Sequence, residues 1–127
     1  VQRCVLLVDD QPLQIRMLSE RLMALRPDLA LLEAHSVDKA LEHLPARSVD
    51  LLICDVRMPD RDGFELLAQV RASVVWESTP LFLVSATESA AESEALHQRS
   101  AREGADGFFT KPLTRTDLED LLEQAGL

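Results

Sequence analysis

The sequence is poor in the features that mark nucleic-acid-binding and membrane-bound proteins. It contains 13 basic residues against 22 acidic ones, a formal net charge of −9, and its Lys and Arg residues form no run. Phosphate backbones and anionic membrane surfaces repel such a chain, so we expect no direct binding of this segment to nucleic acid or membrane. The surplus of carboxylates indicates either a charged, soluble surface or a cation site.

No apolar run approaches the roughly 18 residues that span a bilayer, and no signal peptide opens the chain. We therefore expect a cytoplasmic location. Linkers, internal repeats and low-complexity tracts are also lacking. The 127 residues, of which 46% are hydrophobic, suffice for one domain with a core that needs no metal or disulfide. We expect residues 1–127 to form this single domain.

Short, continuous apolar runs alternate with helical patterns along the chain. Continuous apolarity over four or five residues is typical of strands covered on both faces, as in parallel sheets. Four clear runs and a weaker fifth lie at residues 4–8, 29–32, 51–54, 81–84 and 107–109. The two cysteines, Cys4 and Cys54, lie in the first and third runs. With Asp10 and Asp55 level on adjacent strands, these cysteines are too far apart for a disulfide.

Helical apolar spacing follows the runs. Four helices are predicted by stripes at Ile15, Leu18, Leu22 and Leu25, at Val37, Ala40, Leu41 and Leu44, at Phe64, Leu67, Val70 and Val74, and at Leu118, Leu121, Leu122 and Ala125. Residues 88–103 are rich in helix formers but contain only Leu96 as a large apolar residue. This pattern predicts a weakly anchored helix, mobile or used for contacts, or else an ordinary exposed helix. Strand and helix alternate throughout, which predicts a five-stranded parallel sheet with helices on both faces.

Polar residues follow four of the five predicted strands, at the edge where ligands bind in such sheets. Asp9 and Asp10 follow the first strand, Asp55 the third, Ser85 the fourth and Lys111 the fifth. Three carboxylates (−3) and one ammonium (+1) leave a charge of −2, which one divalent cation neutralises. Oxygen ligands without a Cys/His cluster favour Mg²⁺ or Mn²⁺. A cation beside a hydroxyl and an ammonium suits a phosphoryl group in transfer.

With these residues in this order, the sequence resembles the receiver domain of two-component response regulators. The matching segments span nearly the whole chain: Asp9-Asp10, Asp55-Val56-Arg57-Met58-Pro59 with Asp62-Gly63 behind it, Ser85-Ala86, and Lys111-Pro112. The resemblance implies a flavodoxin-like, doubly wound (βα)5 fold with strand order 2-1-3-4-5. It also implies Mg²⁺-dependent transfer of a phosphoryl group from a histidine kinase or a histidine phosphotransfer protein.

The resemblance assigns a role to each acidic residue. Asp55 is the expected phosphoacceptor, and an acyl phosphate formed there would transfer or hydrolyse readily, so that the signal is erased. The expected metal ligands are the carboxylates of Asp10 and Asp55 and the backbone carbonyl of Arg57. Asp9 is expected to act largely through metal-bound water.

Four further roles follow from the same resemblance. Ser85 and Lys111 would each bind a phosphoryl oxygen, and Phe108 would be the aromatic residue that turns inward with Ser85 as the domain switches. The bond before Pro112 is expected to be cis. Without the family, Phe108 is a buried strand residue and Pro112 ends a loop in the trans form.

The chain departs from the family pattern in two places. The stretch from Ser85 to Lys111 is a few residues longer than usual, in the region that the family uses for dimers and output. A homodimer is an open expectation, and the family's standard dimer mode is not carried over to this chain. Arg57 stands two positions after the acceptor, where it either reaches over the phosphoryl site or points to solvent. An effector domain or protein, in a longer parent chain or separate, would carry the output.

Other classes fit the sequence less well. A Mg²⁺-dependent phosphatase of the haloacid-dehalogenase type also uses a nucleophilic Asp, but its signature is Asp-x-Asp and not the adjacent pair Asp9-Asp10. A dinucleotide-binding domain needs a Gly-rich turn after the first strand, where this chain has Asp-Asp-Gln-Pro. A degenerate receiver that acts only as a scaffold would not need the acceptor, acidic pair, hydroxyl and Lys that are all present.

Overall fold

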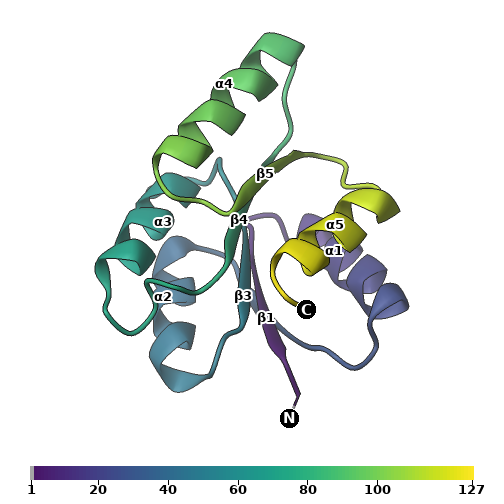
Figure 1. The fold of residues 1–127 in the computed structure, drawn as a ribbon, viewed down its shortest axis with the longest axis vertical. Coiled ribbons are helices and arrows are strands. Elements are labelled where there is room, and N and C mark those ends of the chain that lie inside the picture. Colours follow the sequence, from purple (N-terminus) through teal and green to yellow (C-terminus); the bar gives the residue numbers. More distant parts are fainter. Residues whose placement is uncertain (1) are drawn as a thin grey trace.

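The computed structural model describes residues 2–127 and has ten alternating elements (Figure 1). Its five strands are β1 (Cys4–Val8), β2 (Ala30–Ala34), β3 (Leu51–Asp55), β4 (Leu81–Ser85) and β5 (Gly107–Thr110). Its five helices are α1 (Pro12–Leu25), α2 (Val37–Ala46), α3 (Gly63–Ala72), α4 (Ala90–Arg102) and α5 (Arg115–Gln124). The strands are all parallel, in the order β2-β1-β3-β4-β5. The predicted fold class is confirmed.

Helices cover both faces of the sheet. Helices α1 and α5 lie on one face, and α2, α3 and α4 lie on the other (Figure 1). Side chains alternate along β1, so that Val5 and Leu7 join the core under α1 and α5, whereas Leu6 and Val8 join the core under α2 and α3. Because both faces are buried, the strands carry unbroken apolar runs.

The strand register differs by one residue from the sequence-based expectation. Val8 pairs with Cys54, so Asp9, and not Asp10, lies level with Asp55. Cys4 and Cys54 are then four residues apart along the strands, at about 3.3 Å per residue, and both are buried free thiols. Burial raises the pKa of each thiol. The prediction that they form no disulfide is confirmed.

Local sequence signals explain most helix boundaries. Pro12 occupies the first turn of α1, where its missing N–H is not needed. Ser36 caps α2 by accepting a hydrogen bond from the Lys39 N–H, and Thr114 caps α5 in a capping box with Asp117. The third predicted stripe is wrong at Val74, because α3 ends at Ala72 and Val74 is exposed.

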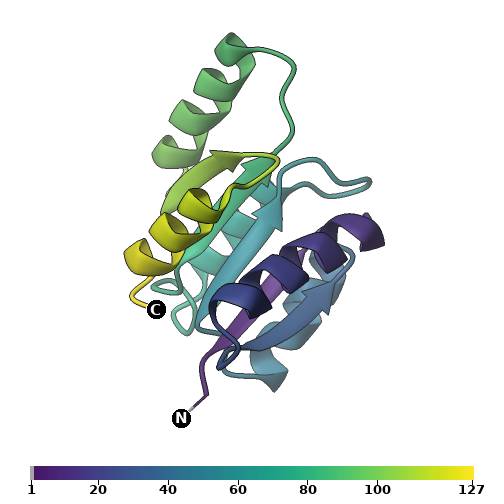
Figure 2. The same ribbon diagram turned by 90° about the vertical axis from the view of Figure 1, so that its right-hand side faces the viewer.

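Helix α4 is the least buried helix of the fold. It projects from the rest of the molecule in both ribbon views (Figures 1 and 2). Ser100 is its one fully buried residue, and Leu96 is only partly buried against the core. Just beyond its end, Arg71 of α3 donates hydrogen bonds to the Gly104 carbonyl at 2.9 Å and to the Asp106 carboxylate at 2.8 Å. Polar contacts therefore hold the turn that follows this helix.

Gly63, at the start of α3, lies against the end of β3. A Cβ atom at this position would lie 2.6 Å from the Asp55 carbonyl oxygen and 3.0 Å from Leu83 Cδ2. The backbone oxygen belongs to the sheet and has little freedom to move away. Only glycine therefore lets α3 begin this close to the strand end that carries Asp55.

Replacing Gly63 with alanine should lower the free energy of unfolding by about 1–3 kcal/mol, because the clash outweighs the gain in helix propensity. Urea unfolding measures this difference. Gln69→Ala, at an exposed position of the same helix, should change stability by less than about 0.5 kcal/mol. A stabilised Gly63→Ala variant would show that the contact relaxes freely.

Candidate functional site

Three carboxylates meet at the carboxyl edge of the sheet. Asp9 directly follows β1, Asp10 is next in the chain, and Asp55 ends β3. One carboxylate oxygen from each lies within 4.8 Å of the others. Asp9 and Asp55 are each about 7% exposed, while Asp10 is more open to solvent. The geometry provides up to three hard oxygen ligands for one cation.

Backbone contacts hold the two acidic loops. The Asp9 N–H donates to the Ala34 carbonyl at 3.1 Å, and the Asp9 carboxylate accepts from the Gln11 N–H at 3.0 Å. On the other loop, the Val56 N–H donates to the Val84 carbonyl at 2.9 Å. The carboxylates are thus fixed by the sheet on which their loops are built, and not by contacts with each other.

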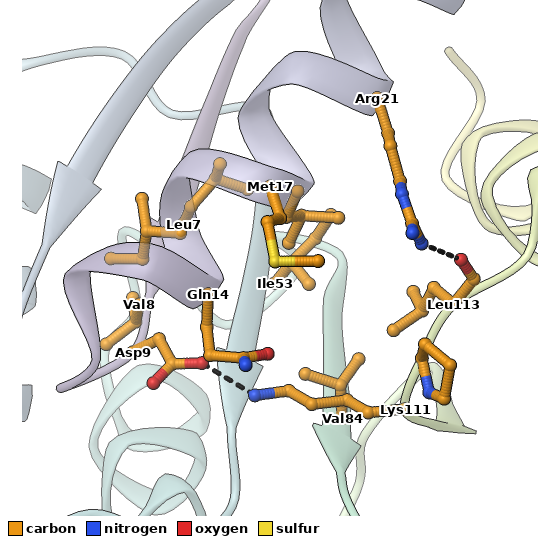
Figure 3. A pocket seen from close by; sticks show the side chains of 13 residues that line it. Leu7, Val8, Asp9, Gln14, Met17, Arg21, Ile53, Val84, Lys111 and Leu113 are labelled. Carbon is orange, nitrogen blue, oxygen red and sulfur yellow. Dashed lines mark hydrogen bonds and ion pairs between the residues drawn. The ribbon is translucent and has the colours of Figure 1, made fainter.

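Lys111 supplies the positive charge of the cluster. Its ammonium lies 2.6 Å from Asp9 Oδ2 and 2.8 Å from Asp55 Oδ1. Figure 3 shows its side chain extended past Val84 toward Asp9. The Lys111 N–H donates to the Ser85 carbonyl at 2.9 Å, and the Lys111–Pro112 peptide bond is cis.

Burial and charge act in opposite directions on this pair. Burial raises the pKa of Asp55, the hydrogen bond and charge of Lys111 lower it, and the charges of Asp9 and Asp10 raise it, so that the pKa ends above its ordinary value. For Lys111, burial lowers the pKa, but the hydrogen bonds and charges of Asp55 and Asp9 together raise it above the ordinary value. The ammonium is therefore retained, and the ionised form of Asp55 is the strained partner.

Ser85 is close to the cluster but does not bond to it. The side chain is 1% exposed, and its hydroxyl donates to the Ala86 carbonyl at 3.0 Å. It lines a surface hollow together with Asp55, Arg57 and Lys111. The hydroxyl must rotate before it can donate to a group held on Asp55.

Two predicted residues have partners outside the carboxylate cluster. Phe108 is 8% exposed and stacks on His97 of α4, with ring centroids 6.3 Å apart. The Arg57 guanidinium forms an ion pair with Glu92 of α4 at 2.5 Å. Sequence reasoning missed both α4 partners, because no pattern within an exposed helix identifies which residues touch the sheet edge.

Helix α1 contributes a wall that sequence reasoning also missed. Gln14 and Met17 line the hollow beside Lys111 (Figure 3). Gln14 and Met17 are three residues apart in a helix that Pro12 begins, and this spacing was a usable signal that they share a face. Nearby, Arg21 donates to the Leu113 carbonyl at 2.6 Å, which ties the loop after Lys111 to α1.

Comparison with known proteins identifies the family to which this architecture belongs. The profile of the response regulator receiver domain matches residues 5–123. The transcriptional regulatory protein UhpA of Salmonella typhimurium is 36% identical over 115 residues, which are 90% of this chain and 54% of UhpA. The Fimbriae Z protein of the same organism is 33% identical over 119 residues, which are 92% of this chain and 51% of the relative.

Solved structures show the same fold. The chemotaxis protein CheY4 of Vibrio cholerae has a TM-score of 0.83 and 26% identity, with 98% of this chain and 99% of that chain covered. The receiver domain of a DNA-binding response regulator from Colwellia psychrerythraea has a TM-score of 0.84 and 22% identity, with 97% of each chain covered.

The chain belongs to the response regulator receiver domain family, and so to two-component signalling. This family is in general not enzymatic. The chain spans about half the length of UhpA and of the Fimbriae Z protein. Among the described residues, no helix is both long and apolar enough to cross a membrane.

Replacing Asp55 with asparagine should raise the free energy of unfolding at pH 7 in the presence of a chelator, by roughly 0.5–2 kcal/mol. The folded state raises the pKa of Asp55, so ionisation at this position costs stability above that pKa. Below about pH 4 the carboxyl is protonated in the unfolded chain as well, and the difference should vanish.

The variant Asp120→Asn removes the same charge at an exposed position of α5 and is the matched control for this measurement. Its free energy of unfolding should stay within about 0.5 kcal/mol of that of the wild type, at pH 7 and below about pH 4 alike. Equal stabilisation by both variants would assign the effect to net charge. Destabilisation by Asp55→Asn would mean that the pairing with Lys111 outweighs the burial of Asp55.

Proposed function

We propose that this receiver domain accepts one phosphoryl group on Asp55, in a Mg²⁺-dependent reaction with a phosphohistidine donor. The observation that carries this proposal is the position of Asp55. Its buried carboxylate lies at the sheet edge, 2.8 Å from the Lys111 ammonium and within one cation's reach of Asp9 and Asp10. The proposed nucleophile thus has a counter-ion and metal-ligating carboxylates close to it.

The donor set fits Mg²⁺. Asp10, Asp55 and the backbone carbonyl of Arg57 would hold the ion, with Asp9 acting through bound water. All of these donors are oxygens, the preference of a hard cation, and Mn²⁺ suits the same set. When bound, the ion would neutralise charge on the carboxylates and on the transferring phosphoryl group.

The transfer itself uses the carboxylate of Asp55 as nucleophile. One carboxylate oxygen forms a bond to phosphorus, the P–N bond of the phosphohistidine breaks, and the electron pair stays on the imidazole nitrogen. Lys111, already in contact with Asp55, would bind one phosphoryl oxygen as negative charge moves onto the site. The resulting acyl phosphate is reactive enough for later hydrolysis.

Ser85 and Phe108 would carry the conformational response. Rotation of the Ser85 hydroxyl away from the Ala86 carbonyl would let it donate to another phosphoryl oxygen. Phe108 is already buried, so its role as a switch would involve a change in its packing against His97 and α4. The pair therefore links the acceptor to the most exposed helix of the domain.

The proposed partners follow from the family and from the length of its members. Receiver domains of response regulators work with histidine kinases and effector domains. We propose a histidine kinase or phosphotransfer protein as donor, and an effector domain or protein as target. Residues 1–127 would act as one domain in the cytoplasm and would bind neither nucleic acid nor membrane. Two copies would be able to form a homodimer, whose mode is not taken from the family. The phosphatase alternative receives no support from the relatives.

Incubation with acetyl phosphate or phosphoramidate and Mg²⁺ should add one phosphoryl group to the wild type. Asp55→Asn should add none, because asparagine is no nucleophile, and a chelator should abolish labelling of the wild type. Intact-mass measurement gives the number of groups directly. Asp120→Asn, with the same change at an exposed aspartate, should be labelled like the wild type.

Equal labelling of the wild type and Asp55→Asn would contradict the proposed acceptor. Phosphomonoesters separate the two classes of protein. Repeated turnover of a small phosphomonoester would indicate a phosphatase, whereas at most one group per chain fits the receiver.

A further inference from the structure

One ion pair joins the acceptor loop to helix α4. Arg57 stands two residues after Asp55, and its guanidinium lies 2.5 Å from the Glu92 carboxylate in the first turn of α4. The Arg57 side chain is 57% exposed and that of Glu92 is 30% exposed. Such a pair is screened by water and is easily exchanged for a stronger one.

The first turn of α4 depends on polar contacts of this kind. Next to Glu92, the Ser93 hydroxyl pairs with the Thr110 hydroxyl at 2.8 Å, and Thr110 directly precedes Lys111. None of the residues in this turn is fully buried. The opposite end is better fixed, since Ser100 is buried and Arg71 holds the turn that follows. Loss of the Arg57 contact should therefore loosen the beginning of α4 more than its end.

Arg57 also belongs to the acceptor site. It lines the same hollow as Asp55, Ser85 and Lys111, and the chain between Asp55 and Arg57 is only one residue long. A phosphoryl group on Asp55 would bring about two negative charges into this hollow, against the single charge of Glu92. The planar guanidinium is well suited to bind phosphoryl oxygens, and it keeps its charge under all relevant conditions.

We propose that Arg57 is shared between α4 and the acceptor site, so that Glu92 and a phosphoryl group on Asp55 compete for one guanidinium. In the unphosphorylated domain Glu92 holds Arg57 and thereby holds the first turn of α4. When the phosphoryl group is present, Arg57 binds it and releases Glu92. The inference rests on the proposed phosphorylation of Asp55 and adds Arg57 as a residue that contacts the phosphoryl group.

The competition predicts opposite effects of the two partners on anion affinity. Beryllofluoride with Mg²⁺ is a phosphoryl mimic that binds the acceptor carboxylate. The Glu92→Gln variant should bind beryllofluoride about two- to fivefold more tightly than the wild type, because the Glu92 carboxylate no longer competes for Arg57. Arg57→Gln should bind at least about threefold more weakly, because it lacks the guanidinium. Isothermal titration calorimetry of the folded domain measures both changes.

The double variant Arg57→Gln/Glu92→Gln provides the decisive comparison. Without Arg57 there is nothing to compete for, so Glu92→Gln should have no effect in this background. Glu94→Gln is the matched control, because Glu94 lies on the same helix and contacts Gln98, not Arg57. Tightening that persists without Arg57, or that Glu94→Gln reproduces, would assign the effect to net charge and overturn the inference.

Hydrogen exchange tests the release of α4 separately. Beryllofluoride should speed amide exchange in the first turn, residues 90–94, and Arg57→Gln should show the faster exchange before any ligand is added. Unchanged exchange in both cases would overturn the release of the helix. Failure of the wild type to bind beryllofluoride would overturn the proposed function and this inference together, whereas normal binding with no effect of Glu92→Gln would overturn the inference alone.

Discussion

The contact of one ammonium with two buried carboxylates is the constraint on which the site depends. Lys111 lies within 2.8 Å of both Asp9 and Asp55, and Asp10 adds a third negative charge nearby. Buried carboxylates resist ionisation unless a cation compensates them. The same crowding of negative charge favours a group that brings positive charge to the cluster.

The stability of the sheet and its two cores offsets the unfavourable free energy of this crowded arrangement. Five parallel strands are buried on both faces, and their apolar side chains form a separate core under each layer of helices. The stability of these two cores lets the carboxyl edge carry groups that oppose folding. Gly63 contributes at the boundary, since it lets α3 begin against the backbone of Asp55. The supporting elements place the backbone of the site, and the contacts of Lys111 with Asp9 and Asp55 then hold the side chains together.

The sequence predicted the parts of the fold that depend on local patterns. Continuous apolar runs predicted the five strands. The positions of Asp9, Asp55, Ser85 and Lys111 at the ends of these runs predicted that they share one edge of the sheet. The register between β1 and β3 was missed by one residue, because continuous apolar runs contain no alternation that distinguishes neighbouring registers. Val74 was wrongly assigned to the helix, because this apolar residue of an exposed turn continues the helical spacing by chance.

Details of the site were beyond prediction for a different reason. The direction of the Ser85 hydroxyl and the choice of Glu92 as the partner of Arg57 each depend on which of several polar groups lies nearest in three dimensions. Such choices differ by little free energy when the groups are partly exposed. Sequence patterns predict the large free-energy contributions of apolar burial well and the small contributions of polar contacts poorly. These small contributions would nevertheless decide how a signal leaves the site.

This difference in magnitude is the reason why α4 would be the element that responds to the site. A helix with a broad apolar face would be held in place by burial, and a change of one or two charges would not move it. Helix α4 has one large apolar residue, Leu96, and meets the acceptor loop through an exposed ion pair. Its first turn is therefore held partly by polar contacts, and the proposed phosphoryl group on Asp55 would change electrostatic interactions of similar size. The poor apolar pattern of this helix, which leaves its contacts hard to predict from sequence, would also make it sensitive to charge at Asp55.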